Sequence, residues 1–286
     1  MSARAENLRY NRSIRGLPRF VMWVVLLCVT ALFLFPFIYL LTTSFKTTID
    51  LSAIPPALLP KHGVAVGNYS SALGRTGVKS ALVNSIVIAV LSTLVTLLLS
   101  VPSAYAAGFF SVKFGRAFLL FALVVRVVPP VAIAIPYASF ANNAHLSDTP
   151  IVVALGQSVV ALPLTIWLLA GFFEAVPKEL HDAATVDGCN RFGAMVRIIL
   201  PLMSGGIAVS ALFAFLTSWN DYLFPLLLTA TRAQTMPVAI ANFQTQYGLD
   251  WGPMTALAVV YTLPVVILTM FLQRRIVAGM TLGAVR

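Results

Sequence analysis

Charged residues are scarce in this chain. Asp, Glu, Lys and Arg make up only 10% of its 286 residues, and only 9 of these are acidic, whereas soluble domains carry about 25% charged residues. Hydrophobic residues account for 59% of the sequence, so most of the chain must be surrounded by lipid rather than by water. This composition excludes a soluble globular domain.

Cysteine and histidine are also rare. Cys28 falls in an expected membrane span and Cys189 in an expected loop, so we expect no disulfide between them. The three histidines, His62, His145 and His181, lie in three different connections, which argues against a metal cluster and predicts solvated loop residues. The chain also lacks a Gly-rich phosphate loop, so we expect no catalytic role and no cofactor of its own.

Long apolar stretches are plentiful by contrast. A helix that crosses the hydrocarbon core needs about 20 apolar residues, and six segments are long enough: 20–45, 80–112, 117–142, 149–173, 198–220 and 251–273. No segment alternates apolar and polar residues as a membrane barrel requires. The sequence therefore predicts an all-α polytopic membrane protein with six transmembrane helices, in a transmembrane domain over 20–273.

Basic residues are unevenly distributed among the connections. If the N-terminus is inside, 13 Lys and Arg residues lie on the cytoplasmic side and 5 on the other, and basic residues gather on the cytoplasmic side of membranes. We therefore predict a cytoplasmic basic N-terminus over 1–19 and a cytoplasmic tail over 274–286. The first apolar stretch is too long for a signal peptide and has no cleavage site after it, so we expect an uncleaved helix.

The connection between the fourth and fifth spans, 174–197, is long and charged but helical in pattern. Glu179 suits the positive end of a helix, Ala183 and Ala184 favour helix formation, and Gly188 suits a C-terminal stop. We expect a short helix that ends at Gly188, with the paired alanines leaving one face bare for a partner.

A second helix is expected directly after this one. Asn190 can cap it, and it would enter the fifth span through Pro201. We expect this rigid connection to carry any force on the first helix into the membrane.

These residues resemble a known motif. Asp182-Ala183-Ala184, Gly188 and Ile198-x-Leu200-Pro201 have the spacing of the EAA loop of binding-protein-dependent ABC importer permeases, although Asp182 stands where that family usually has Glu. The chain is most similar to the maltose-type carbohydrate-uptake group, through Asn68-Tyr69, Asn84-Ser85, Ala104-Tyr105-Ala106, Trp219-Asn220-Asp221 and the end of the chain from Gln273 to Val285. The resemblance implies that a cytoplasmic ATPase docks on Glu179, Asp182, Ala183, Ala184 and Gly188.

The resemblance also implies a function and partners. It implies a multi-pass permease subunit of an ATP-binding-cassette importer in the bacterial inner membrane, forming half of the pathway for a sugar or related solute. The implied partners are a second homologous permease, an ATPase dimer that binds ATP and Mg, and an extracytoplasmic solute-binding protein. The basic residues lie at membrane flanks, so we expect no nucleic acid partner. The solute (disaccharide, monosaccharide, polyol or glycerol-phosphate ester) and the choice of homodimer or heterodimer remain open.

Two places are candidates for solute contact. Arg126 lies within the third apolar stretch, where a charge costs about 2.5–3.5 kcal/mol, so it faces the translocation cavity, pairs with a neighbouring subunit, or serves a structural pair or reaches an interface. An aromatic ring, an amide, a carboxylate and a phenol, which suit a sugar, gather at the outer end of the fifth span in Trp219, Asn220, Asp221 and Tyr222. Aromatic residues that belt the membrane interface are the alternative interpretation.

Two other classes of protein fit the sequence less well. An ion-gradient-driven secondary transporter would need coupling-ion groups near the midplane and commonly an internal repeat, but the spans hold only Arg126 as a charge and the two halves show no convincing match. A membrane enzyme would need a nucleophile, a base and an orienting group at one membrane level, and no such cluster is seen.

Overall fold

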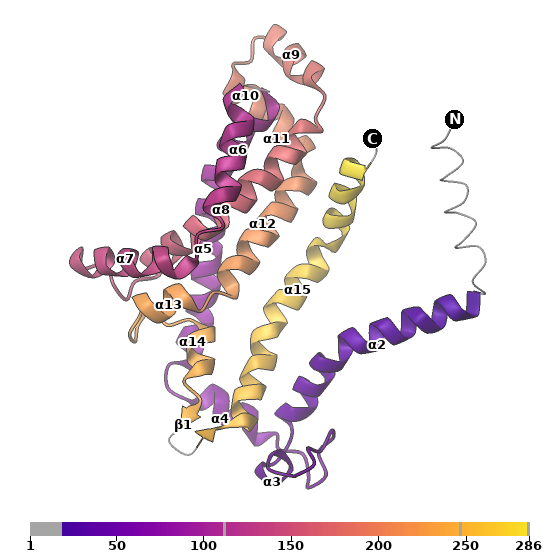
Figure 1. Cartoon of the computed structure of the whole chain (residues 1–286), viewed down its shortest axis with the longest axis vertical. Helices are drawn as coiled ribbons and strands as arrows, with labels where there is room; N and C mark the ends of the chain where they lie inside the picture. Colours follow the sequence, from indigo (N-terminus) through magenta and orange to yellow (C-terminus); the bar gives the residue numbers. More distant parts are fainter. Residues whose placement is uncertain (1–18, 111–112, 246–247, 285–286) are drawn as a thin grey trace. The chain divides into compact units, whose positions relative to one another are not determined.

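The computed structural model describes residues 19–110, 113–245 and 248–284, with side chains described as far as Gln273 (Figure 1). The predicted N-terminal segment 1–19 therefore lies outside the described residues apart from Arg19. So do the side chains of the C-terminal motif after Gln273. The regular elements of the described residues are helices, apart from one antiparallel pair of two-residue strands, β1 (Gln244–Thr245) and β2 (Gly248–Leu249). The all-α prediction is confirmed.

The helical elements follow one another along the chain, and residues 52–66 form a long connection between two of them. In order they are α2 (Arg19–Ser44), α3 (Thr48–Leu51), α4 (Gly67–Gly74), α5 (Val78–Ala104), the π-helical η1 (Tyr105–Phe109), α6 (Lys113–Val125), α7 (Pro130–Asn143), α8 (Pro150–Glu174), α9 (Lys178–Val186), α10 (Arg191–Ala194), the π-helical η2 (Met195–Ile199), α11 (Leu200–Leu202), α12 (Ser204–Trp219), α13 (Leu223–Leu228), α14 (Met236–Ala241) and α15 (Trp251–Ala284).

Four helices in the described chain are long and apolar enough to cross a membrane unbroken: α2, α5 with η1, α8, and α15 as far as Gln273. The predicted third and fifth spans are each bent instead, by 84° between α6 and α7 and by 85° between α11 and α12. The number of candidate spans is therefore four, or six if each bent pair crosses once. The six predicted spans thus correspond to four unbroken helices and two bent helix pairs.

Proline explains the first bend, and proline with glycine accounts for the second. Pro129 has an extended conformation (φ −57°, ψ 130°) directly before Pro130, the first residue of α7, because a residue that precedes proline disfavours the helical region. The second bend falls at Met203, between Pro201 and the pair Gly205-Gly206, and both residue types weaken a helix.

The chain divides into two compact units. One comprises the residues up to Ser71 with Asp250–Val259, and the other comprises Ala72–Leu249 with the residues from Val260 onward. In the first unit, the Asn68 amide donates to the backbone oxygens of Ser44 (2.9 Å) and Lys46 (3.0 Å). The loop after α2 is thereby fixed to the start of α4.

A buried carboxylate organises the loop after α3 in the first unit. Asp50 is 2% exposed; its Oδ1 lies 2.6 Å from His62 Nδ1, and its Oδ2 accepts the backbone N–H groups of Lys61 and His62. The hydrogen bond from the His62 side chain lowers the pKa of Asp50 to about 2. His62 itself is exposed, as predicted for a loop residue.

Helices α5, α8 and α12 pack together as the centre of the second unit (Figure 1). Small polar residues lie at their contacts, as where the Ser92 and Ser158 hydroxyls meet at 3.3 Å, and small residues let membrane helices approach closely. Two apolar clusters flank this centre. One contains Tyr105, Phe173 and Ile199, and the other gathers around Phe224. The first cluster supports the segment that the sequence singled out.

Candidate functional site

Helix α9 (Lys178–Val186) occupies the segment predicted to contact an ATPase. Pro177 directly precedes its first residue, at a position where the missing N–H costs nothing. At the other end Gly188 has a left-handed backbone (φ +85°), and the N–H groups of Gly188 and Cys189 donate to carbonyls of the last turn at 3.1 and 3.0 Å. This is a Schellman C-cap. The predicted stop at Gly188 is confirmed.

The two alanines of α9 lie on different faces of the helix. Ala183 is exposed together with Glu179 and Asp182, whereas Ala184 is only 2% exposed and faces its own chain. Successive residues of an α-helix are about 100° apart, so neighbouring alanines cannot share one bare face, and that expectation was wrong. The outward face of α9 carries Glu179, Asp182 and Ala183.

His181 is the second departure from expectation on α9. It was predicted to be a solvated loop residue, as His62 and His145 are, but it is only 7% exposed. Its ring lies among aromatic rings near the end of α5, namely Tyr105, Phe109 and Phe110. The prediction was wrong because the partners of this ring lie far away in the sequence.

The second helix begins as predicted. Asn190 Oδ1 accepts the N–H of Gly193 at 2.7 Å, which is an N-cap hydrogen bond. The chain then continues without a break through α10, η2 and α11 to Leu202, and turns by 85° before α12. We call residues 178–202 the coupling segment. It reaches the fifth span through the bend at Met203 rather than by running straight into it.

The four residues predicted to contact a solute have different surroundings. Trp219 is 2% exposed and its ring stacks on that of Tyr261 at 4.8 Å. Asp221 accepts hydrogen bonds from the Gln157 amide (3.0 Å) and the backbone N–H of Phe224. The other two, Asn220 and Tyr222, are exposed.

Gln157 of α8 is a polar residue that the sequence analysis missed. It is 2% exposed; its Oε1 accepts from the Ser218 hydroxyl and its Nε2 donates to Asp221. A search for charges overlooks an amide, yet a polar group within an apolar span needs a partner. These hydrogen bonds connect α8 to the end of α12 and the residues directly after it.

Arg126 lies at a bend rather than within a continuous helix. It directly follows the last residue of α6, between α6 and α7, and it is exposed. The prediction placed it within the third apolar stretch. The charge therefore stands at an interruption of the helix, where the two following prolines begin a new direction.

Asp148 is a second residue that the sequence analysis missed. Its carboxylate accepts the backbone N–H groups of four consecutive residues, 230–233, at 2.9–3.2 Å. Burial opposes the charged form, but these hydrogen bonds outweigh it and lower the pKa of Asp148 to about 2. We call Asp148 and residues 230–233 the Asp148 clamp.

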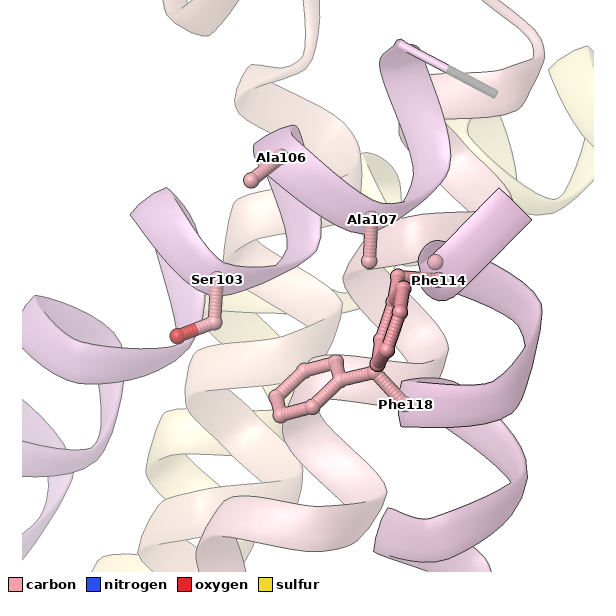
Figure 2. A pocket seen from close by; sticks show the side chains of 6 residues that line it. Ser103, Ala106, Ala107, Phe114 and Phe118 are labelled. Carbon is pink, nitrogen blue, oxygen red and sulfur yellow. The ribbon is translucent and has the colours of Figure 1, made fainter. Parts of the chain in front are cut away.

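Two hollows in the second unit are apolar. One, of about 320 Å³, lies beside η1 and is lined by alanine, glycine and phenylalanine residues and by Ser103 (Figure 2). The other, of about 510 Å³, lies between α5, α12 and α15, and its one polar side chain is Thr93. Neither lining offers several hydrogen-bonding groups to a polar solute. Among the described residues, no three His, Cys, Asp or Glu side chains are placed to hold a metal ion.

Several membrane-length helices, with a short capped helix between two of them, define an integral membrane protein. Residues 76–282 match the family described as "Binding-protein-dependent transport system inner membrane component", and the chain belongs to that family. It is a non-catalytic, multi-pass inner-membrane permease subunit of a binding-protein-dependent ABC importer. The ion-gradient alternative is set aside accordingly.

Curated relatives align over most of the chain. The trehalose transport system permease protein SugB of Mycobacterium tuberculosis is 34% identical over 95% of this chain and 99% of its own length. The sulfoquinovosyl glycerol transport system permease protein SmoH of Agrobacterium fabrum is 33% identical over 88% of this chain and 89% of its own length. The diacetylchitobiose uptake system permease protein DasC of Streptomyces coelicolor is 31% identical over 88% and 91%, respectively.

Solved structures share the fold. A chain of a bacterial ABC transporter that imports alginate superposes with a TM-score of 0.74 at 20% identity, covering 89% of this chain and 95% of the other. A chain from the bacterial alginate ABC transporter in complex with its alginate pentasaccharide-bound periplasmic protein gives 0.63 at 15% identity, covering 88% and 92%.

Proposed function

We propose that this permease forms half of the pathway for a sugar or related solute. The observation that carries the proposal is that three relatives named for trehalose, diacetylchitobiose and sulfoquinovosyl glycerol transport each align over 88% or more of the chain. These solutes are all carbohydrates or carbohydrate derivatives. The remaining half of the pathway is supplied by a second, homologous permease subunit.

The proposed arrangement has six spans with both termini in the cytoplasm. Each bent helix pair crosses the membrane once, and α9 lies on the cytoplasmic side. The excess of basic residues in the connections on that side, 13 against 5, supports this orientation.

The outward face of α9 docks on a cytoplasmic ATPase dimer that binds ATP and Mg. Glu179, Asp182 and Ala183 are exposed for this contact, as is Gly188 at the cap, and Ala184 supports the helix from within. Closure of the ATPase moves α9, and the helical chain from α10 to α11 carries the motion to the bend at Met203 and so to α12. A solute-binding protein delivers the solute on the opposite side.

The exposed side chains of Asn220 and Tyr222 are the proposed direct contacts for the solute. Trp219 and Asp221, which are held by Tyr261 and Gln157, set the position of the two contacts. Arg126, exposed at its bend, faces the translocation cavity or the neighbouring subunit.

Co-purification tests the docking proposal. Ala183→Trp adds a large side chain to the outward face of α9 and should abolish recovery of the ATPase with the tagged permease. Ala144→Trp is the matched control, because Ala144 is also an exposed alanine but lies between α7 and α8; it should leave recovery unchanged. Full recovery of the ATPase with Ala183→Trp would refute docking on this face.

Uptake into liposomes tests the solute class. The permease, reconstituted with its partner subunits and binding protein, should take up a labelled sugar only when ATP is supplied inside. Competition with unlabelled disaccharides, monosaccharides, polyols and glycerol-phosphate esters then ranks the candidates. ATP-dependent uptake that no carbohydrate or polyol competes with would contradict the proposed class.

A further inference from the structure

His181 is a buried polar side chain on a helix whose charged residues, Lys178, Glu179 and Asp182, are all exposed. Its ring centroid lies 5.3 Å from that of Phe109, 5.4 Å from Phe110 and 6.4 Å from Tyr105. Within the described residues, Nε2 has no hydrogen-bond partner, and Nδ1 lies 3.6 Å from Asp182 Oδ1, which is too long for a hydrogen bond. The contact between His181 and these rings is therefore one of packing.

The coupling segment touches the same rings at a second point. The Arg191 guanidinium lies 5.2 Å from the centroid of the Phe110 ring, and the Tyr105 hydroxyl donates to the backbone oxygen of Arg191 at 3.3 Å. Helix α9, through His181, and the first residue of α10, Arg191, thus contact one aromatic cluster, which belongs to η1 and the residue after it.

The backbone of the π-helical η1 packs closely against α8 and α6. A Cβ on Gly108 would lie 2.7 Å from the Ala170 oxygen of α8, and a Cβ on Gly115 of α6 would lie 2.4 Å from the Ala107 oxygen of η1. Figure 2 shows the contact between η1 and α6, with Phe114 of α6 beside Ala107 and Phe118 beside Phe114. Because the backbones are in contact, a shift of η1 towards α8 or α6 would displace that helix. Single turns of π-helix are frequent at functional sites.

We propose that His181 is a positioning residue through which α9 moves η1, and with it the inner ends of α5, α6 and α8. This route runs beside the one through α10 and α11 to α12. The proposal rests on the proposed docking of the ATPase on α9, and it adds a second path by which that motion enters the membrane helices.

The test measures solute transported per ATP hydrolysed in liposomes that contain the permease, its partner subunits and the binding protein. His181→Ala removes the ring from the cluster and should lower this ratio about tenfold, while the ATPase still co-purifies and still hydrolyses ATP. His145→Ala, the same substitution at an exposed histidine between α7 and α8, is the matched control and should leave the ratio unchanged.

Two replacements separate packing from hydrogen bonding. His181→Phe keeps a ring of similar shape and should restore the ratio, whereas His181→Gln keeps polar atoms without a ring and should not. Rescue by Gln and not by Phe would overturn the proposal, as would an unchanged ratio in His181→Ala.

Other outcomes distinguish this proposal from the docking proposal. If His181→Ala releases the ATPase, His181 belongs to the docking surface and the second route is refuted. If Ala183→Trp keeps the ATPase, docking on the outward face is wrong and the route through His181, which rests on it, is wrong too. If Ala183→Trp releases the ATPase but His181→Ala leaves the ratio unchanged, docking stands and only the route is refuted. Phe110→Leu alters the same contact from the η1 side and should also lower the ratio. Phe110→Leu is the variant to measure if His181→Ala does not fold. An unchanged transport ratio in Phe110→Leu would refute the route.

Discussion

The coupling segment and the Asp148 clamp are held to the rest of the second unit by different interactions. The coupling segment rests on apolar and aromatic surfaces, with His181, Met195 and Ile199 buried against the cluster around Tyr105. The clamp is instead one carboxylate that accepts four backbone N–H groups. The coupling segment is therefore held by buried apolar area, and the clamp by aligned hydrogen bonds.

This difference bears on which region can move. Hydrogen bonds weaken steeply when their angles change, so the clamp breaks rather than slides. Apolar burial has no preferred direction, so packed surfaces can shift as a unit with small loss. We infer that the loops joined by Asp148 remain fixed during transport while the coupling segment moves.

Removing the carboxylate should break the clamp and produce the largest loss of stability. Asp148→Ala leaves four N–H groups without their acceptor, which should lower the free energy of unfolding by about 2 kcal/mol. Thermal unfolding of the detergent-solubilised permease measures this as a fall in the midpoint. Asp148→Asn, which keeps one acceptor oxygen but no charge, should fall between Asp148→Ala and the unmodified protein. An unchanged midpoint in Asp148→Ala would show that the clamp does not stabilise the fold.

A smaller effect is expected at the cap of α9. Gly188 has φ of +85° and no other atom within 4 Å of the place where a Cβ would lie, so Gly188→Ala should cost about 1 kcal/mol through backbone strain alone. Hydrogen exchange should become faster in α9 and stay unchanged in residues 230–233. Gly171→Ala is the control, since Gly171 is helical with equal space and no positive φ. Faster exchange at the clamp as well would contradict the independence of the two regions.

The features predicted from the sequence are those with local causes. The stop at Gly188 and the cap at Asn190 depend on residues within five positions of each other, so spacing alone reveals them. The four unbroken spans follow from length and apolarity, which composition records directly. The predicted docking role of α9 comes from the resemblance to the EAA loop, because contact with a partner protein leaves no mark on the fold of the chain itself.

The features that were missed depend on distant partners. Asp148 meets Arg232 across 84 positions, and Gln157 meets Asp221 across 64, so no local pattern marks either residue. His181 looks like a loop residue until the rings at the end of α5 are brought to it. The two bends escaped because proline marks where a helix weakens but not by how much the chain then turns.

Acidification should weaken the clamp only well below neutral pH, so near neutral pH this is the smallest of the expected effects. The pKa of Asp148 is about 2 in the folded protein against an ordinary value of 3.8, so the carboxylate is ionised in both folded and unfolded states above about pH 5. Its contribution is therefore constant from about pH 7 to about pH 5. It is lost as the pH falls from about 4 towards about 2, because the unfolded chain binds the proton first.

The difference in unfolding midpoint between the unmodified protein and Asp148→Ala measures this contribution. It should stay level over the first interval and shrink by about pH 3.5. Asp50, whose pKa is also about 2, contributes equally to both proteins and cancels in this difference. If this difference in midpoint grew on acidification, the ionised carboxylate would not be the form that accepts the N–H groups.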